Sequence, residues 1–185
     1  MFQKIGKYTA LCGSSMLIVM AAATAQAADG HVEFTGVIND NPCTISSDSV
    51  RKPVEMGQVR IADFASTVGS TAGATPFSIS LENCSGPTLK NASIKFSGQQ
   101  ALSDATVLGM TGENQVAGVG IQINDARTGS KLALNTASSD YVLRPQGNTF
   151  DFTASYVRLA ADTEEKSGIG TGKVNALASF DVTYK

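Results

Sequence analysis

Few residues of this sequence could take part in catalysis, and their spacing fits no common site. The sequence contains a single histidine, His31, which removes most Ser/His/Asp and Cys/His arrangements and any metal site built from several imidazoles. The acids that could supply a general acid and base for a hydrolase are Asp104, Glu113, Asp125 and Asp140. No spacing among them favours one pair, so the sequence predicts that the protein is not an enzyme.

Two further stretches look like ligand-binding loops but fail on detail. Residues 168–174 read GIGTGKV, yet Ser167 stands where a phosphate-binding loop needs glycine and Val174 where it needs Ser or Thr. The acidic cluster at 162–165 lacks the alternating carboxylates and the glycine of a calcium-binding loop. We therefore expect neither a metal ion nor another cofactor.

The start of the chain has the pattern of a secretory signal peptide. Lys4 and Lys7 precede an apolar run from Leu11 to Ala23, and residues 25–27 supply a small-x-small cleavage site. Cleavage there leaves 158 residues, enough for one domain with a sizeable core. The remaining 12 basic and 16 acidic side chains give a formal charge of −4, which favours neither nucleic acid nor anionic lipid as a partner. No later segment is apolar enough to span a membrane.

Two cysteines remain in the exported part of the chain, Cys43 and Cys84. In an oxidising compartment we expect them to form a disulfide bond. Closing a loop of this length contributes about 4 kcal/mol on the chain-entropy model. The alternatives are free thiols or a metal-binding pair, although two cysteines without a nearby histidine make a poor zinc site.

Short runs of alternating apolar and polar residues, separated by turn residues, recur along the mature sequence. Alternation with a period of two places one face of a strand on a core. Many strands at such spacing are typical of a β-sandwich with two sheets. Only residues 61–66 indicate a helical turn. The expected strands are 53–59, 76–84, 92–98, 119–125, 131–135, 149–159 and 174–185.

The two ends of the mature chain carry similar alternation. Near the first end, Val32, Phe34 and Ile38 lie on one face, which Gly36 interrupts. At the other end, an unbroken apolar face consists of Val174, Ala176, Ala178, Phe180, Val182 and Tyr184. A strand with one apolar face has to lie on some sheet. The pattern leaves open whether the first strand pairs within its own chain or on another molecule.

Taken together, these features resemble the chaperone–usher fimbrial subunits, above all the major pilin of type 1 fimbriae. The resemblance covers essentially the whole mature chain, including the stretches GHVEFTGVINDNPC, PVEMGQV, VGIQINDARTG, FDFTASYVRL and ASFDVTYK. Its features are the export signal, Gly36 seven positions before Cys43, Cys84 at the end of FSISLENC, Gly172 fourteenth from the end and the penultimate Tyr184.

The resemblance implies an all-β fold, an incomplete immunoglobulin-like β-sandwich that lacks its final strand and is completed by a donor strand from another subunit. It divides the chain into a signal peptide at 1–27, which is removed, a donor-strand extension at 28–42 and a pilin domain at 43–185. Such completion is β-augmentation, in which backbone hydrogen bonds supply affinity and alternate side chains supply register. The donor-strand residues would be Val32, Phe34, Gly36 and Ile38.

The same resemblance implies that the C-terminal strand lines the open groove and is recognised by a periplasmic chaperone. The bare position of Gly36 is expected where the donor backbone approaches the groove floor closely. The alternative is a bulge in a strand of the chain's own sheet. Counting in twos from Ile38, the outermost anchor position falls on Gly30, which has no side chain to start insertion. The groove and chaperone-recognition residues would be Gly172, Val174, Ala176, Ala178, Phe180, Val182, Tyr184 and Lys185.

The implied function is that of a structural subunit of a surface fimbria, which polymerises by donor-strand exchange and supports cell adhesion. The implied partners are neighbouring pilin subunits in a homopolymer, a periplasmic chaperone and an outer-membrane usher, with neither nucleic acid nor direct membrane insertion. The chain would pass through the periplasm and end in a cell-surface fimbrium. The alternatives are a minor adaptor subunit of the same fibre and a self-contained secreted β-sandwich that binds a ligand.

Overall fold

The computed structural model describes residues 32–36, 42–85 and 90–185. The chain divides into two units, 1–38 and 39–185, of which the second contains all the described helices and strands. The expected signal peptide and Ile38 lie outside the described residues. No described helix is long and apolar enough to cross a lipid bilayer.

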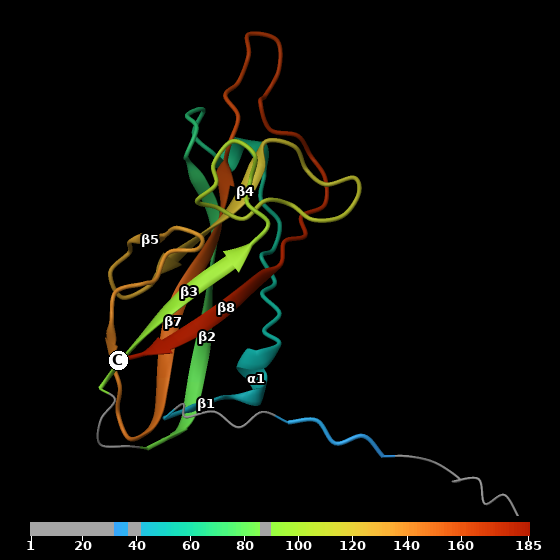
Figure 1. The fold of residues 1–185 in the computed structure, drawn as a ribbon. Coiled ribbons are helices and arrows are strands. Elements are labelled where there is room, and N and C mark those ends of the chain that lie inside the picture. Colours follow the sequence, from blue (N-terminus) through green and yellow to red (C-terminus); the bar gives the residue numbers. More distant parts are fainter. Residues whose placement is uncertain (1–31, 37–41, 86–89) are drawn as a thin grey trace, which may run out of the picture. The chain divides into compact units, whose positions relative to one another are not determined.

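The described strands form two sheets, so the expected all-β sandwich is confirmed (Figure 1). The larger sheet has five strands in the order β1-β2-β7-β4-β5, and the smaller has three in the order β6-β3-β8. All pairs of named strands are antiparallel. The strands are β1 (Thr44–Ile45), β2 (Thr71–Cys84), β3 (Asn91–Gly98), β4 (Val119–Asp125), β5 (Lys131–Leu132), β6 (Tyr141–Val142), β7 (Gln146–Arg158) and β8 (Ala178–Tyr184).

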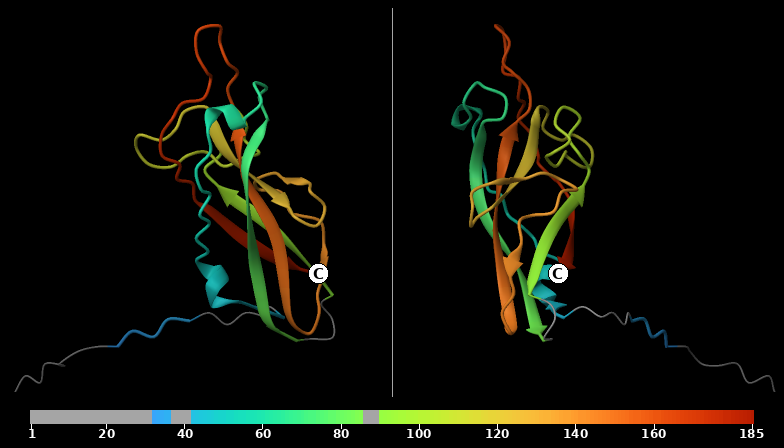
Figure 2. Two further views of the ribbon diagram at one scale, coloured as in Figure 1. Left: turned by 180° about the vertical axis from the view of Figure 1, so that it is seen from behind. Right: turned by 60° about the vertical axis from the view of Figure 1, so that its left-hand side comes forward.

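The long strands β2 and β7 pair side by side and carry much of the core (Figure 2). Their register sets Phe77 opposite Phe152 and Ile79 opposite Phe150. Alternation places these side chains on the inner face, where Ile79 is 2% exposed and Phe152 is fully buried. Aromatic rings then join the two sheets, since Phe96 of β3 lies edge-on to Phe152 at 5.1 Å between ring centroids.

The smaller sheet is built on β3, which pairs with β8 from Ala92 opposite Tyr184 to Gly98 opposite Ala178. On its other side β3 pairs with the short strand β6. Among the described residues β8 therefore has a partner on one side only. The unpaired edge of a strand offers a row of backbone donors and acceptors to another chain.

Several expected strands differ from the structure. The strand expected at 131–135 is the two-residue β5, whereas β2 and β7 begin earlier than residues 76 and 149. Residues 53–59 are extended but belong to no described strand, because their backbone has no ladder partner. The C-terminal strand begins at Ala178 rather than at Val174, because β3 ends at Gly98 and the residues before Ala178 bond to another loop.

The expected helical turn at 61–66 is present as a 3₁₀ turn over Ile61–Asp63 (η1). A second short helix, α1 (Ser47–Val50), was not expected from the alternation pattern. It follows β1 and the disulfide bond between Cys43 and Cys84, which confirms the predicted pairing. The bond fixes the start of the sandwich to the end of β2.

Candidate functional site: an open groove on the core

A groove of about 1860 Å³ opens on the core of the sandwich. One wall is the segment 50–61, which runs from the end of α1 to the start of η1. The other is formed by residues 169–180, which include the first part of β8. Figure 1 shows the two walls as the teal segment above α1 and the red strand β8.

The floor of the groove is made of core side chains from both sheets. An interior that is packed on all sides would leave few voids larger than a water molecule. Here a groove far larger than a water molecule reaches apolar core side chains, although most of these floor residues are themselves buried. The floor residues include Phe77 and Ile79 of β2, Phe96 of β3, Ile121 and Ile123 of β4, and Tyr156 of β7.

The wall at 50–61 is held by one hydrogen bond and one glycine. The hydroxyl of Tyr156 donates to the carbonyl oxygen of Gly57 at 2.9 Å. Gly57 has a φ of +68°, a value that favours glycine. It interrupts the period of two, so the next half-buried side chain after Met56 is Val59, three positions later. Gly73 faces this wall, since a Cβ there would lie 2.5 Å from Cγ1 of Val59.

The opposite wall begins with a loop and continues into β8. The backbone N–H of Val116 donates to the carbonyl oxygen of Lys173 at 3.0 Å, and the N–H of Thr111 to that of Asn175 at 2.8 Å. Farther along, Phe180 is half-buried with its ring 6.5 Å from that of Phe96. The apolar face of β8 is thus shared between the core and the groove.

Burial shifts the pKa of two tyrosines, one in the groove floor and one near the chain end. It raises the pKa of Tyr156, whose ring forms part of the floor, and that of Tyr184 near the chain end. Charged side chains lie at the margin instead. Arg60 pairs with Asp63 at 2.6 Å, and the hydrogen bond between them lowers the pKa of the Asp63 carboxyl.

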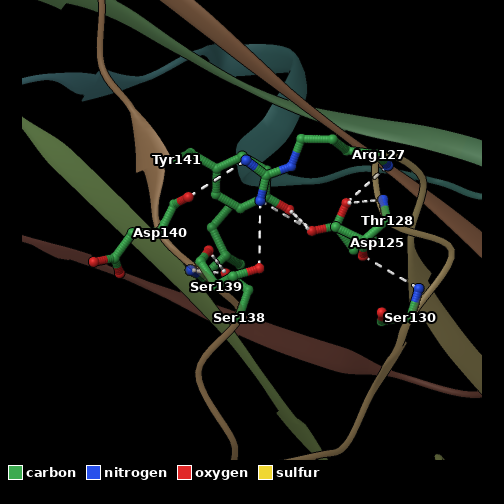
Figure 3. A network of polar contacts seen from close by, with 9 residues as sticks. Asp125, Arg127, Thr128, Ser130, Ser138, Ser139, Asp140 and Tyr141 are labelled. Atoms are coloured by element: carbon green, nitrogen blue, oxygen red, sulfur yellow. Dashed lines mark hydrogen bonds and ion pairs between the residues drawn. The ribbon is translucent and has the colours of Figure 1, made fainter.

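A buried carboxylate lies elsewhere, at the end of β4 (Figure 3). Asp125 is fully buried and accepts hydrogen bonds from the hydroxyl of Tyr141 at 2.9 Å and the backbone N–H of Arg127 at 2.8 Å. The Arg127 guanidinium lies 4.4 Å from the centre of the Tyr141 ring. Burial, and next the Asp125 hydrogen bond, raise the pKa of Tyr141. Because β4 and β6 belong to different sheets, this network ties the sheets together.

The side chains of the other three acids considered for hydrolysis take no part in this network, although the backbone carbonyl oxygen of Asp140 accepts a hydrogen bond from Nη1 of Arg127 at 3.4 Å (Figure 3). Asp104 bonds to Thr106 and Lys131, whereas Asp140 pairs with Lys185 at 2.7 Å. Glu113 is exposed in a loop. Among the described residues no group of three or more His, Cys, Asp or Glu side chains could hold a metal ion.

The structure places the proposed C-terminal residues in two groups. Gly172, Val174, Ala176, Ala178 and Phe180 all line the groove. Val182 and Tyr184 lie farther along β8 and pack on the core as half-buried side chains.

The chain end is engaged with its own sheet. The carbonyl oxygen of Lys185 accepts the backbone N–H groups of Lys90 at 2.9 Å and Asn91 at 3.0 Å. Recognition of Tyr184 and Lys185 by a chaperone stays a prediction.

The described part of the N-terminal extension is exposed. Val32 is 76% exposed and Phe34 is 92% exposed, which is unusual for large apolar side chains. A Cβ added to Gly36 would meet nothing within 4 Å, so packing in this structure does not explain the glycine. The role of these residues as a donor strand, together with Ile38, stays a prediction.

The wall at 50–61 was missed as a part of the site. Its alternation of Val54, Met56 and Val59 was interpreted as an ordinary strand. A period of two shows that one face of the segment is covered, but it does not show which part of the structure covers that face. The signal that could have found it is Gly57, which breaks the alternation in the middle of the run.

The fold has counterparts among solved structures. An immunoglobulin-like sandwich of this kind is found in pilus subunits assembled by a chaperone and an usher. A subunit in the structure of a chaperone–usher pilus superposes with a TM-score of 0.65 at 22% identity, over 89% of this chain and 100% of that chain.

Sequence comparison identifies the family. Residues 32–185 match the family described as "Fimbrial protein", and the chain belongs to this family. It is 36% identical to a probable major fimbrial subunit, LpfA, of Escherichia coli O157:H7, over 87% of this chain and 86% of the relative. It is 33% identical to the type-1 fimbrial protein, A chain, of Escherichia coli K12, over 96% of this chain and 94% of the relative. The protein is thus a structural subunit of a surface fimbria.

Proposed function

We propose that this subunit polymerises by donor-strand exchange, in which the groove of one copy takes up residues 28–42 of the next. The observation that carries the proposal is the groove between the walls at 50–61 and 169–180, which reaches core side chains of both sheets. Val32, Phe34, Gly36 and Ile38 of the incoming copy would face this floor.

The side chains of the extension suit the groove in character. Fully burying an apolar side chain of this size contributes about 1.5–3 kcal/mol, before the cost of ordering the extension is subtracted. Val32 and Phe34 are both exposed in the single chain, so nearly all of this gain remains available for assembly. Aromatic rings already form part of the floor, among them Phe77 and Phe96.

The backbones on both sides of the groove support the same proposal. β8 has one strand partner among the described residues, and 51–59 lies in no described ladder. An added strand beside β8 would give its free edge the hydrogen bonds that an antiparallel sheet supplies. Since a head-to-tail contact of this kind does not close on itself, the product is a filament.

The extension's glycine has a role in this scheme. Nothing surrounds Gly36 in the single chain, which removes local crowding as a reason for glycine. A position in the apolar face where the incoming backbone lies close to the groove floor would exclude a side chain.

The remaining partners follow from the same groove. Before assembly a periplasmic chaperone would fill it with a strand of its own, near Tyr184 and the carboxylate of Lys185, and an outer-membrane usher would bring successive subunits together. Export would begin with the signal peptide at 1–27. We infer a homopolymer that supports cell adhesion, with no catalysis and no cofactor, because completing the fold supplies the free energy of each step.

The test compares the mature chain with a version lacking residues 28–40, each released from its chaperone. We expect the mature chain to form long SDS-resistant polymers. The truncated chain should stay monomeric and bind an added 28–42 peptide. If both chains remain compact monomers of equal stability, the extension is not a donor strand, and a self-contained binding domain becomes the better explanation.

A further inference from the structure

The last residue of β7 is a buried arginine. Arg158 is 1% exposed, and its Nη1 donates to Oδ1 of Asp162 at 2.5 Å and to the carbonyl oxygen of Ala160 at 3.4 Å. Its Nε has no hydrogen-bond partner among the described residues. A buried guanidinium depends strongly on its carboxylate, because removal of one partner leaves a buried charge uncompensated.

Asp162 makes a second contact, which closes the loop after β7. The same Oδ1 accepts the backbone N–H of Gly168 at 2.8 Å. The turn is tight, since a Cβ on Gly168 would collide with the carbonyl oxygen of Ala161. One carboxylate oxygen therefore connects the buried end of β7 to the far side of the loop.

The residues that follow Gly168 form a wall of the groove. Ile169 is 3% exposed and lines the groove. Gly170 donates its N–H to the carbonyl oxygen of Ala117 at 3.1 Å, and Lys173 accepts the N–H of Val116 at 3.0 Å. The Asp162 contact therefore sets the position of residues 169–173, the first part of the wall at 169–180.

We propose that Asp162 is a positioning residue for strand uptake. By holding Arg158 and Gly168 with one oxygen, it fixes the wall at 169–173 in the conformation that receives a donor strand. This inference rests on the proposed function of the groove and adds to it a residue that lies outside the groove lining.

The surroundings of Asp162 define how the contact responds to acid. The Arg158 hydrogen bond, followed by the Gly168 hydrogen bond, lowers the pKa of the Asp162 carboxyl. The contact is therefore present above the ordinary carboxyl pKa and is lost as the pH falls through the lowered value. Asp162 and Arg158 share a pocket of about 530 Å³ with the charged residues Glu164, Glu165 and Lys166.

The test uses the full mature chain with Asp162→Asn and a labelled 28–42 peptide in excess. Asp104→Asn is a matched control, because the side chains of Asp104 and Asp162 are similarly exposed, at 32% and 35%. The two acids differ in their partners, since Asp104 pairs with a lysine that is not buried. We expect Asp162→Asn to slow peptide uptake about tenfold, because a neutral amide oxygen accepts from the Arg158 guanidinium more weakly than a carboxylate does. The control should keep the wild-type rate.

A second readout separates positioning from general stability. Asp162→Asn should speed hydrogen exchange at the amides of Gly168 and Gly170 while the amides in the middle of β7 keep their protection. Asp162→Glu should recover part of the uptake rate. If the amide substitution destabilises the fold, Arg158→Met with Asp162→Ala removes both the buried charge and the acceptor of the Gly168 N–H.

The outcomes are distinct. Uptake at the wild-type rate, or slowing in proportion to a lower free energy of global unfolding, would overturn the role of Asp162. Failure of the wild-type chain to take up the peptide would overturn the proposed function itself.

Discussion

The two ends of the mature chain carry similar apolar alternation and differ in what covers it. At the C-terminal end, β8 pairs with β3, and Phe180 and Val182 are half-buried. At the N-terminal end, Phe34 is 92% exposed. Alternation in a sequence therefore shows that one face of a strand needs to be covered. It does not show which molecule covers that face.

The comparison is sharper because β8 is itself incompletely covered. Its first residues line the groove that we propose as the site of the extension. In the proposed assembly, each end of the chain supplies one half of a contact between copies. Substitutions at the two ends should therefore separate the stability of the subunit from the stability of the fibre.

The largest effect on the subunit alone is expected from the disulfide bond at the boundary between the extension and the sandwich. Replacing Cys43 and Cys84 together by serine opens a link across a sequence separation of 41 residues. The free energy of unfolding should fall by about 4 kcal/mol. Urea unfolding of the monomer measures it. An unchanged midpoint would show that the bond does not stabilise the sandwich.

Phe34→Ala tests the N-terminal end alone. The monomer should keep its free energy of unfolding, because the ring is exposed there. The fibre should lose about 3 kcal/mol per contact if the ring is buried in the groove. The SDS concentration that dissociates fibres measures the loss, with Thr35→Ala as a control on the opposite face. Equal effects of the two substitutions would contradict the proposed orientation of the strand.

Phe180→Ala tests the C-terminal end, where one ring serves both the core and the groove. We expect the monomer to lose about 2 kcal/mol, less than for a fully buried phenylalanine, because Phe180 is half-buried. Fibres should weaken further. Urea unfolding and SDS dissociation of the same variant give the two values. A loss confined to the monomer would indicate that the donor strand does not reach this ring.

Gly36→Ala tests the close approach of the extension to the groove floor. Assembly should slow about tenfold, since overpacking of this kind costs about 1–3 kcal/mol. The monomer should be unaffected, because no atom lies within 4 Å of the added methyl group. The rate is measured by quenching assembly reactions of the variant and the wild type, at the same protein concentration, after a series of times and determining the amount of polymer. Wild-type assembly of this variant would favour a bulge in place of a groove contact.

The smallest effect is expected from Tyr184→Phe. Burial raises the pKa of Tyr184, so the neutral phenol is favoured in the folded chain. Its contribution to stability is complete below the unfolded pKa of about 10 and is lost as the pH rises through the higher folded value. The substitution should flatten the fall in unfolding free energy above pH 10 and change little at pH 7. An unchanged slope would show that Tyr184 does not contribute to it.

The sequence by itself determined much of the architecture. Strong alternation located β4 at Val119–Asp125, and the cysteine count in an exported chain predicted the bond between Cys43 and Cys84. These features depend on local pattern and on covalent chemistry. The short elements α1, β1 and β6 were missed, because two to four residues are too few to show a period.

Only the tertiary structure decided what lies beside each strand. It showed that 53–59 has no ladder partner among the described residues, that the C-terminal ladder starts at Ala178, and that a groove lies between these walls. It also brought Asp162 to Arg158 and Gly168, a contact that the acidic sequence of the loop did not indicate. The physical reason is that a period of two specifies which side chains share a face, whereas the neighbour of that face is set by chain segments far away in the sequence.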